Sequence, residues 1–139
     1  MSVFTPQELE YLKSQRLGRL ATVDAKGQPQ NSPVGFRYNA DLDVIEIGGR
    51  AMSKTKKFRN IQKNPHVAFV VDDVQPPWKP RCVEIRGEAQ ALAEGGAGFF
   101  GPDYPADPGL IRIRPTQIIS FGLEGGPDEA SNRKVARVK

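Results

Sequence analysis

The 139-residue sequence has a single cysteine, Cys82, and a single histidine, His66. One cysteine cannot form an internal disulfide, which agrees with a reducing environment, and we expect a cytoplasmic protein. His66 follows Pro65 directly and precedes an expected strand, so we assign it a structural role. Asp72 and Asp73 lack a histidine or further carboxylates in register with them, so no metal site is expected. We find no Ser/His/Asp or Cys/His arrangement and name no catalytic residue.

Long apolar runs are also missing. No stretch approaches the roughly 18 residues that a membrane helix needs, so we expect no membrane span. The first six residues lack both the basic stretch and the apolar segment of an export signal. A chain of this length is expected to form one domain. We place that domain at residues 1–124 and a polar C-terminal tail at residues 125–139.

Positive charge, in contrast, is concentrated in one segment. The net charge is +4, and residues 49–63 contain no acidic residue but six basic ones: Arg50, Lys54, Lys56, Lys57, Arg59 and Lys63. A compact anion such as a phosphate suits this cluster at least as well as a polymer does. Nucleic acid is the weaker reading, because the cluster has no interleaved aromatic for base stacking except Phe58, which should be buried.

Alternating apolar and polar residues predict six strands, at residues 18–24, 29–38, 44–47, 67–71, 83–89 and 111–121. Residues 72–80 are expected to form a loop, and residues 94–108 are rich in glycine and proline. Short strands joined by hairpins favour a small closed barrel, which also removes exposed sheet edges. The sequence therefore predicts a mainly β fold.

Two short helices accompany the strands. Thr5, Pro6 and Glu8 form a helix start with a capping box. The second helix is predicted at residues 53–63 and is ended by Asn64 and Pro65. The basic cluster of residues 49–63 overlaps this second helix, so we look for a binding site there.

Lysines occupy the first turn of the second helix, where the macrodipole is positive and cations are unfavourable. An anion bound to the free N–H groups would offset both effects, and Ser53 and Thr55 would add hydroxyl donors. The same pattern is typical of a solvated basic helix face. The residues alone leave both readings open.

Three short motifs follow one another between Leu20 and about Ala91. Residues 21–24 with 27–29 are similar to the first hairpin of a known family. Lys57 with residues 64–69 is similar to its helix-to-strand motif, and residues 83–89 to its V-x-(I/V)-x-G-x-A strand. In this order the motifs resemble the pyridoxamine 5′-phosphate oxidase-like family of flavin- and deazaflavin-binding proteins. Residues 34–38, 56–59 and 111–116 look most like its actinobacterial branch, which is thought to use coenzyme F420.

The resemblance implies a six-stranded antiparallel split β-barrel with short helices. It also implies a homodimer, with two cofactor sites in the clefts between subunits. By position, Thr55, Lys56 and Lys57 would hold the cofactor phosphate. Four further positions complete the site that the resemblance implies. Arg37 corresponds to a lysine of the family that reaches the cofactor, and Ile47 and Gly48 correspond to residues that line the cofactor ring. Phe121 falls close to the position of an aromatic residue that the partner subunit contributes.

The sequence departs from the flavin oxidases at informative places. Ser32 stands where they usually have an arginine on the phosphate, which weakens the case for FMN. The C-terminal arginine and histidine pattern that grips pyridoxine phosphate is absent, so this is not pyridoxamine phosphate oxidase itself. Arg50, Lys54 and Arg59 could meet the acidic lactyl-glutamyl tail of coenzyme F420.

The resemblance therefore implies an F420-dependent oxidoreductase. Reduced coenzyme F420 would donate hydride to an activated double bond of a small organic acceptor, and the cofactor would carry the chemistry. Three alternatives remain open: an FMN-dependent oxidoreductase on the same fold, a non-catalytic carrier of the cofactor, and a nucleic-acid-binding module. The sequence names neither the acceptor nor a proton donor.

Overall fold

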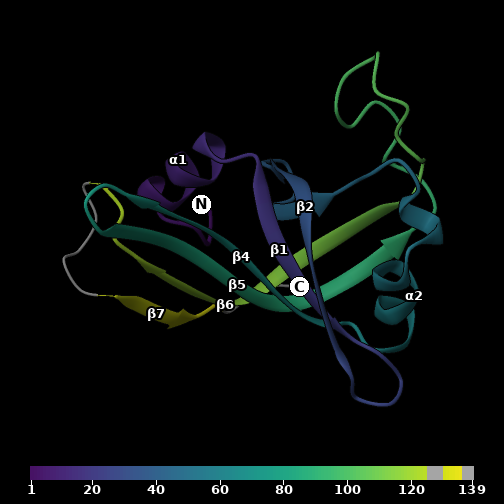
Figure 1. Ribbon diagram of the computed structural model, residues 1–139, viewed down its shortest axis with the longest axis horizontal. Coiled ribbons are helices and arrows are strands. Elements are labelled where there is room, and N and C mark those ends of the chain that lie inside the picture. Colours follow the sequence, from purple (N-terminus) through teal and green to yellow (C-terminus); the bar gives the residue numbers. More distant parts are fainter. Residues whose placement is uncertain (125–129, 136–139) are drawn as a thin grey trace.

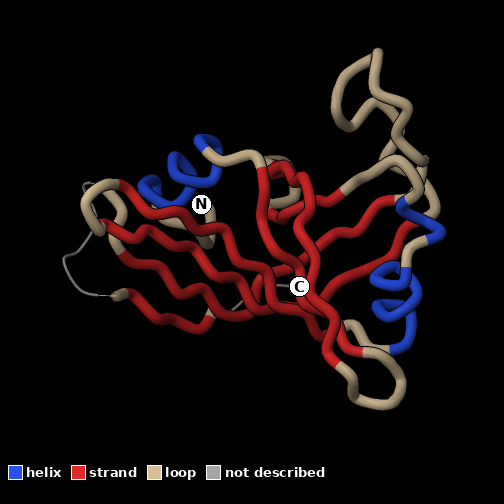
Figure 2. Tube along the Cα trace, viewed as in Figure 1, coloured by secondary structure: helices blue, strands red, loops and turns tan. Residues whose placement is uncertain are grey.

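Seven strands and two α-helices make up the described part of the chain, residues 1–124 and 130–135, in the computed structural model (Figure 1). In chain order the elements are α1 (Pro6–Ser14), β1 (Leu17–Val23), β2 (Pro29–Asn39), β3 (Val44–Ile47), the 3₁₀ turn η1 (Met52–Lys54), α2 (Lys56–Lys63), β4 (His66–Gln75), β5 (Lys79–Leu92), β6 (Leu110–Phe121) and β7 (Ser131–Lys134). Figure 2 shows α1 and α2 at opposite ends of the strands. No helix in these described ranges is long and apolar enough to cross a membrane.

Six of the strands close into the antiparallel barrel that the sequence predicts. The strand order is β3-β2-β1-β4-β5-β6, and β6 pairs back onto β3, with Ile113 opposite Ile45. The N-terminal half of β6 makes this closing contact. Its C-terminal half pairs with β7 instead, with Ile119 opposite Asn132. Strands β3 and β7 therefore share one edge of β6, and β5 pairs along the other.

Strand β7 was not expected, because the sequence analysis placed residues 125–139 in a polar tail. Residues 125–129 and 136–139 of that tail lie outside the described residues. The hairpin between β4 and β5 is also longer than expected. The two strands pair as far as Gln75 and Lys79, within the predicted loop at 72–80. The predicted loop was wrong at its two ends. The charged and proline residues there indicate exposure to solvent, but they do not interrupt the hydrogen-bonded pairing of β4 with β5.

The alternating residues of the strands fill the barrel. Leu20, Phe69 and Ile85 are at most 1% exposed, and Ile45, Ile47, Ile111, Ile113 and Ile118 are fully buried with them. Helix α1 begins with the predicted capping box: Glu8 N donates to Thr5 Oγ1 at 3.1 Å, and Thr5 N donates to Glu8 Oε1 at 2.9 Å. Helix α2 packs against β1 and β5 at the other end.

Candidate functional site

Helix α2 begins at Lys56, three residues later than the sequence predicts, because Ser53 and Lys54 lie in the 3₁₀ turn η1. Lys56 and Lys57 occupy its first turn, as expected. Thr55 is the N-cap: its hydroxyl accepts from Phe58 N at 3.3 Å and donates to the carbonyl oxygen of Met52 at 2.7 Å. Lys56 and Lys57 follow directly, and the first turn has no acidic residue. The N-terminal end of α2 is therefore a positively charged position with no compensating carboxylate on the helix itself.

The buried Asn60 fixes α2 against the barrel. Its side-chain amide donates to Thr22 Oγ1 at 3.0 Å and to Gln30 Oε1 at 3.1 Å. These bonds join the helix to β1 and β2 at the same time. The first turn of α2 is consequently held at a defined position beside β2.

A pocket of about 240 Å³ opens at this end of α2. Four of the predicted site residues line it together: Gly48, Arg50, Thr55 and Lys57. The rest of its wall comes from residues 33–35 of β2, from residues 49–52, and from Phe100 and Tyr104 of the loop between β5 and β6. The structure thus brings the helix N-terminus and the end of β3 to one cavity.

Lys57 is the most unusual charge in this pocket. Its side chain is half-buried, and burial lowers its pKa from the ordinary lysine value. Within residues 1–124 and 130–135, no carboxylate forms an ion pair with it. A half-buried cation without a partner is costly, and a bound anion would offset that cost.

Ser32 presents a second unsatisfied group on β2. Its Oγ is buried and has no hydrogen-bond partner in the part of the chain that the structure describes. Buried polar atoms are nearly always paired, so an orphaned hydroxyl calls for a ligand or water. Ser32 does not line the pocket, although the next residue of β2, Pro33, does. Lys57 alone of the two therefore fits the phosphate of a cofactor bound in this pocket.

The neighbouring lysines differ from Lys57. Lys56 Nζ lies 3.8 Å from Asp24 Oδ2, and its side chain is 53% exposed. The carbonyl of Lys54 accepts from Arg59 Nη1 at 2.9 Å. Neither Lys54 nor Lys56 lines the pocket, so the structure separates them from Lys57.

Three other predicted positions also lie apart from the pocket. Arg37 donates from Nε to Glu46 Oε1 at 3.0 Å, and its guanidinium lies 4.4 Å from the centre of the Phe99 ring. The Ile47 side chain is fully buried in the core. Phe121 is at the far end of β6, opposite Cys82.

Glu46 is a buried charge that the sequence reasoning missed. It is 1% exposed, yet Arg37 and Arg112 contact it from the strands on either side at 2.9 Å, and Asn39 donates to it at 3.2 Å. Burial raises the pKa of Glu46, but these bonds outweigh it and hold the pKa below its ordinary value. The available signal was a glutamate inside a short apolar strand, which requires cationic partners on its neighbours.

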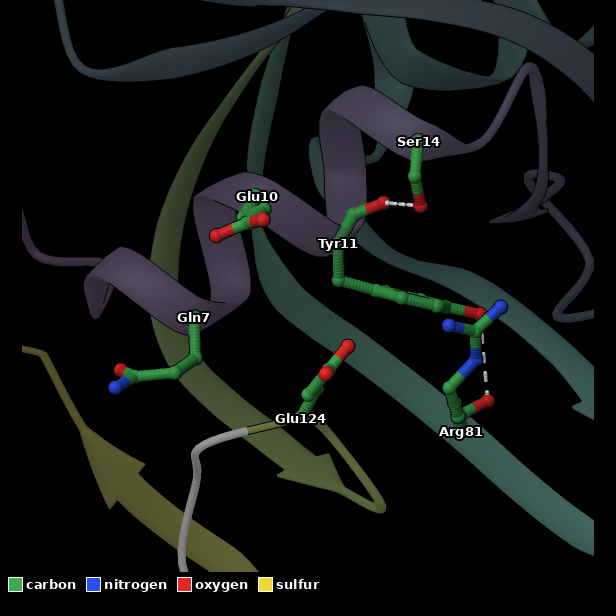
Figure 3. Close-up of a pocket in the computed structure, with 6 residues that line it drawn as sticks. All are labelled: Gln7, Glu10, Tyr11, Ser14, Arg81 and Glu124. Atoms are coloured by element: carbon green, nitrogen blue, oxygen red, sulfur yellow. Dashed lines mark hydrogen bonds between the residues drawn. The ribbon is translucent and has the colours of Figure 1, made fainter.

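A larger cavity, about 400 Å³, lies elsewhere, beside α1 (Figure 3). It is lined by Gln7, Glu10, Tyr11, Ser14, Arg81 and Glu124. Its one arginine is already paired with Asp73 at 2.8 Å and lies over the Tyr11 ring. Because its remaining charges are carboxylates, this cavity does not suit a phosphate and contains none of the predicted residues.

The single cysteine is not a candidate nucleophile. Cys82 is buried, and burial raises the pKa of its thiol to about 11. No group of three or more histidine, cysteine, aspartate or glutamate side chains able to hold a metal ion occurs in the described ranges. The chemistry that the pocket supports is therefore the binding of an anionic ligand.

Comparison with known proteins points in the same direction. Residues 4–121 match the family described as pyridoxamine 5′-phosphate oxidase. The 5a,11a-dehydrotetracycline/5a,11a-dehydrooxytetracycline reductase of Streptomyces rimosus is 48% identical over 124 residues, which cover 88% of this chain and 85% of that protein.

Solved structures share the fold at lower identity. A conserved protein of Mycobacterium tuberculosis has a TM-score of 0.68 and 21% identity, covering 87% of this chain and 86% of its own. A heme storage protein of Vibrio cholerae has 0.67 and 19%, covering 93% and 100%. An FAD-binding protein of Mesorhizobium loti has 0.61 and 20%, covering 84% and 93%. The fold thus holds different cofactors in different proteins.

Proposed function

The chain belongs to the pyridoxamine 5′-phosphate oxidase family, and from this premise we propose that it is an F420-dependent reductase. The observation that carries the proposal is Lys57, a half-buried lysine without an ion-pair partner among the described residues, in a pocket that Thr55 and Gly48 also line. A relative 48% identical over most of both chains is a reductase, which supports redox activity for this chain.

Coenzyme F420 is preferred over FMN because of the charges around the pocket. Ser32 replaces the phosphate-binding arginine that the resemblance leads one to expect for FMN, and a serine hydroxyl supplies one hydrogen bond without a charge. Arg50 lines the pocket and is exposed. It is available to the acidic tail that distinguishes F420 from FMN. An FMN-dependent oxidoreductase is the alternative.

The residues of this chain would bind and orient the cofactor. Lys57 would hold the phosphate, together with the N–H groups at the start of α2, while Thr55, whose hydroxyl donates to the Met52 carbonyl, caps the helix beside it. When bound, the reduced deazaflavin supplies a hydride, so that an acceptor double bond gains hydride at one carbon and a proton from water at the other while the cofactor is oxidised by two electrons. The dehydrotetracycline substrates of the Streptomyces relative make a conjugated ring ketone the first acceptor to test.

We also propose that the protein is a homodimer whose partner completes the cofactor site. The pocket holds about 240 Å³, which is below the 300–1,000 Å³ typical of small-molecule sites, and it is partly open to solvent. A second subunit would enlarge and enclose it. Light scattering should give about twice 15.3 kDa. A monomer that still binds the cofactor would contradict the dimer.

Separate fluorescence titrations with coenzyme F420 and FMN test the proposed cofactor. We expect F420 to bind and FMN to bind more weakly. Micromolar FMN affinity without F420 binding would overturn the cofactor while leaving the fold intact. Turnover of reduced F420 with 5a,11a-dehydrotetracycline would then separate a reductase from a cofactor carrier, since a carrier binds F420 and oxidises none.

A further inference from the structure

The loop between β5 and β6, residues 93–109, carries three aromatic rings at the pocket. In Figure 1 it stands away from the barrel at the end that carries α2. Phe100 and Tyr104 line the same pocket as Lys57. The rings meet edge to face, with centroids 4.6 Å apart for Phe99 and Phe100 and 4.9 Å apart for Phe100 and Tyr104.

Two glycines provide a floor without side chains beneath these rings. Gly35 lies on β2 and Gly48 directly follows β3, next to the paired residues Phe36 and Ile47. A Cβ at Gly35 would lie 2.6 Å from the Phe100 ring, and one at Gly48 would lie 2.8 Å from the Phe99 ring. The Phe99 and Phe100 rings therefore lie directly over bare backbone, and Phe100 and Tyr104 form part of the pocket wall.

The base of the loop is fixed while its aromatic tip is open to solvent. The Asp107 carboxylate accepts from Ser53 Oγ at 2.9 Å and from Gly109 N at 2.7 Å, and Asp107 N donates to the carbonyl of Gly49 at 2.8 Å. The loop is thus tied to the segment that leads into α2. Gly98 and Gly101, on either side of the Phe pair, adopt positive φ in open surroundings.

The exposure of two of these rings is unusual for aromatic side chains. Phe100 is 41% exposed and Tyr104 is 37% exposed. Water contact of this extent is unfavourable for apolar rings, and neither ring is needed to fill the core. A flat, conjugated molecule stacked against them would remove that contact and gain the preference of aromatic surfaces for one another.

We propose that Phe100 and Tyr104 determine acceptor specificity by selecting planar, conjugated polycyclic molecules. The inference deepens the proposed function and rests on it for the reaction. The pocket offers an anion-binding side at Lys57 and an aromatic side at Phe100 and Tyr104. An acceptor with a single small ring can enter the same pocket, but it gains less, because it cannot contact both Phe100 and Tyr104 at once.

The test is direct binding of tetracycline, followed by its own fluorescence, to protein without cofactor. Phe100→Leu and Tyr104→Leu keep apolar volume and remove the ring. Each should raise the dissociation constant about 3- to 10-fold, the range of one aromatic contact. Trp78→Leu is the matched control, since Trp78 is 75% exposed in the β4–β5 turn and does not line the pocket. It should leave binding unchanged.

Failure of the inference and failure of the proposed function give different results. If wild-type protein does not bind tetracycline, or if all three variants bind it as wild type does, the aromatic wall is wrong whatever the cofactor. If F420 does not bind but tetracycline binding falls in the two loop variants only, the wall stands and the cofactor is wrong. With active enzyme, the same variants should raise KM for 5a,11a-dehydrotetracycline by a larger factor than KM for 2-cyclohexenone.

Discussion

The helices at the two ends of the barrel differ in whether the buried charge that each carries is paired. On α1, Glu8 is fully buried and accepts hydrogen bonds from Thr5 N, from Ser120 Oγ at 2.7 Å and from Arg133 Nη1 at 2.9 Å. On α2, Lys57 is half-buried, and no described residue forms an ion pair with it. The fold pairs the first charge itself and leaves the second without an ion-pair partner among the described residues. We therefore expect Glu8 to control the free energy of unfolding and Lys57 to control the affinity for the cofactor.

The largest effect should come from Glu8→Ala. Burial raises the pKa of Glu8, but the bonds from Arg133, Thr5 and Ser120 outweigh it and lower the pKa, so the carboxylate is charged and paired at neutral pH. Its removal leaves Arg133 without its partner and breaks the capping box. The free energy of unfolding should fall by about 3 kcal/mol, at the low end for a broken buried pair because Arg133 is partly exposed. Guanidinium chloride denaturation measures it.

The exposed Glu10 of the same helix is the control. Glu10→Ala should change stability by no more than about 0.5 kcal/mol. Equal losses for the two variants would show that the buried pair does not set the stability of this end. Cofactor affinity should stay at the wild-type value in both.

Lys57→Ala should have the opposite pattern. Cofactor binding should weaken by about 1.5–3 kcal/mol, the range for a hydrogen bond to a charged group. Without cofactor, the melting temperature should stay equal or rise, since a cation in the first turn of a helix is unfavourable. Fluorescence titration and thermal melting of the same samples give both numbers.

Lys63 lies in the last turn of α2 and serves as the matched control. Its charge suits the helix dipole there, and it does not line the pocket. Should Lys57→Ala and Lys63→Ala bind the cofactor alike, the basic cluster is a solvated face. Should both lose stability, the charge pattern of α2 is structural.

The pH dependence of binding sharpens the same contrast. Burial lowers the pKa of Lys57 below the ordinary 10.5, so its positive charge is lost at lower pH than that of an exposed lysine. Cofactor affinity should therefore decline as the pH rises through this lowered pKa, while the folding cost of the buried charge, present below it, disappears. Lys57→Arg keeps its charge and should hold its affinity over the pH range in which the affinity of the wild type declines. An identical decline in both proteins would assign it to another group.

Lys56→Ala should give the smallest effect. Its side chain is 53% exposed and is directed to Asp24, and surface pairs of this kind contribute about 0–1 kcal/mol. Cofactor affinity should change less than threefold in the fluorescence titration. A loss as large as that of Lys57→Ala would mean that Lys56 leaves Asp24 for the phosphate.

Local patterns explain which parts of the structure could be predicted. The alternation in β1 and β5, and the Thr5-to-Glu8 spacing, act over a few residues and can be read from the sequence. Strand β7 could not, because Ser131–Lys134 is polar and is held by Arg133 reaching Glu8 across 125 positions. The separation of Lys56 from Lys57 depends on Asp24, which sequence order does not connect to them.

The resemblance placed the phosphate position on the helix that the structure brings to the pocket. It did not indicate the aromatic loop, because a segment rich in glycine and proline has no periodicity to show which way its rings face. The contact of Glu46 with Arg112 could not be predicted either, because it depends on barrel closure. Glu46 and Arg112 become neighbours only when β3 and β6 pair, whereas Arg37 lies on β2, the hairpin neighbour of β3.

That closure has a consequence for how the chain is made. Glu46 on β3 and its partner Arg112 on β6 are 66 residues apart, so the edge of β3 waits for β6 during synthesis. At about 5–20 residues per second, the wait is about 3–13 s. During that time the apolar strand around Ile45 and Ile47 has an unpaired edge that another nascent chain could join. A charge in the middle of such a strand discourages that pairing. We therefore expect Glu46 to oppose association of the unfinished chain before its ion pair with Arg112 forms.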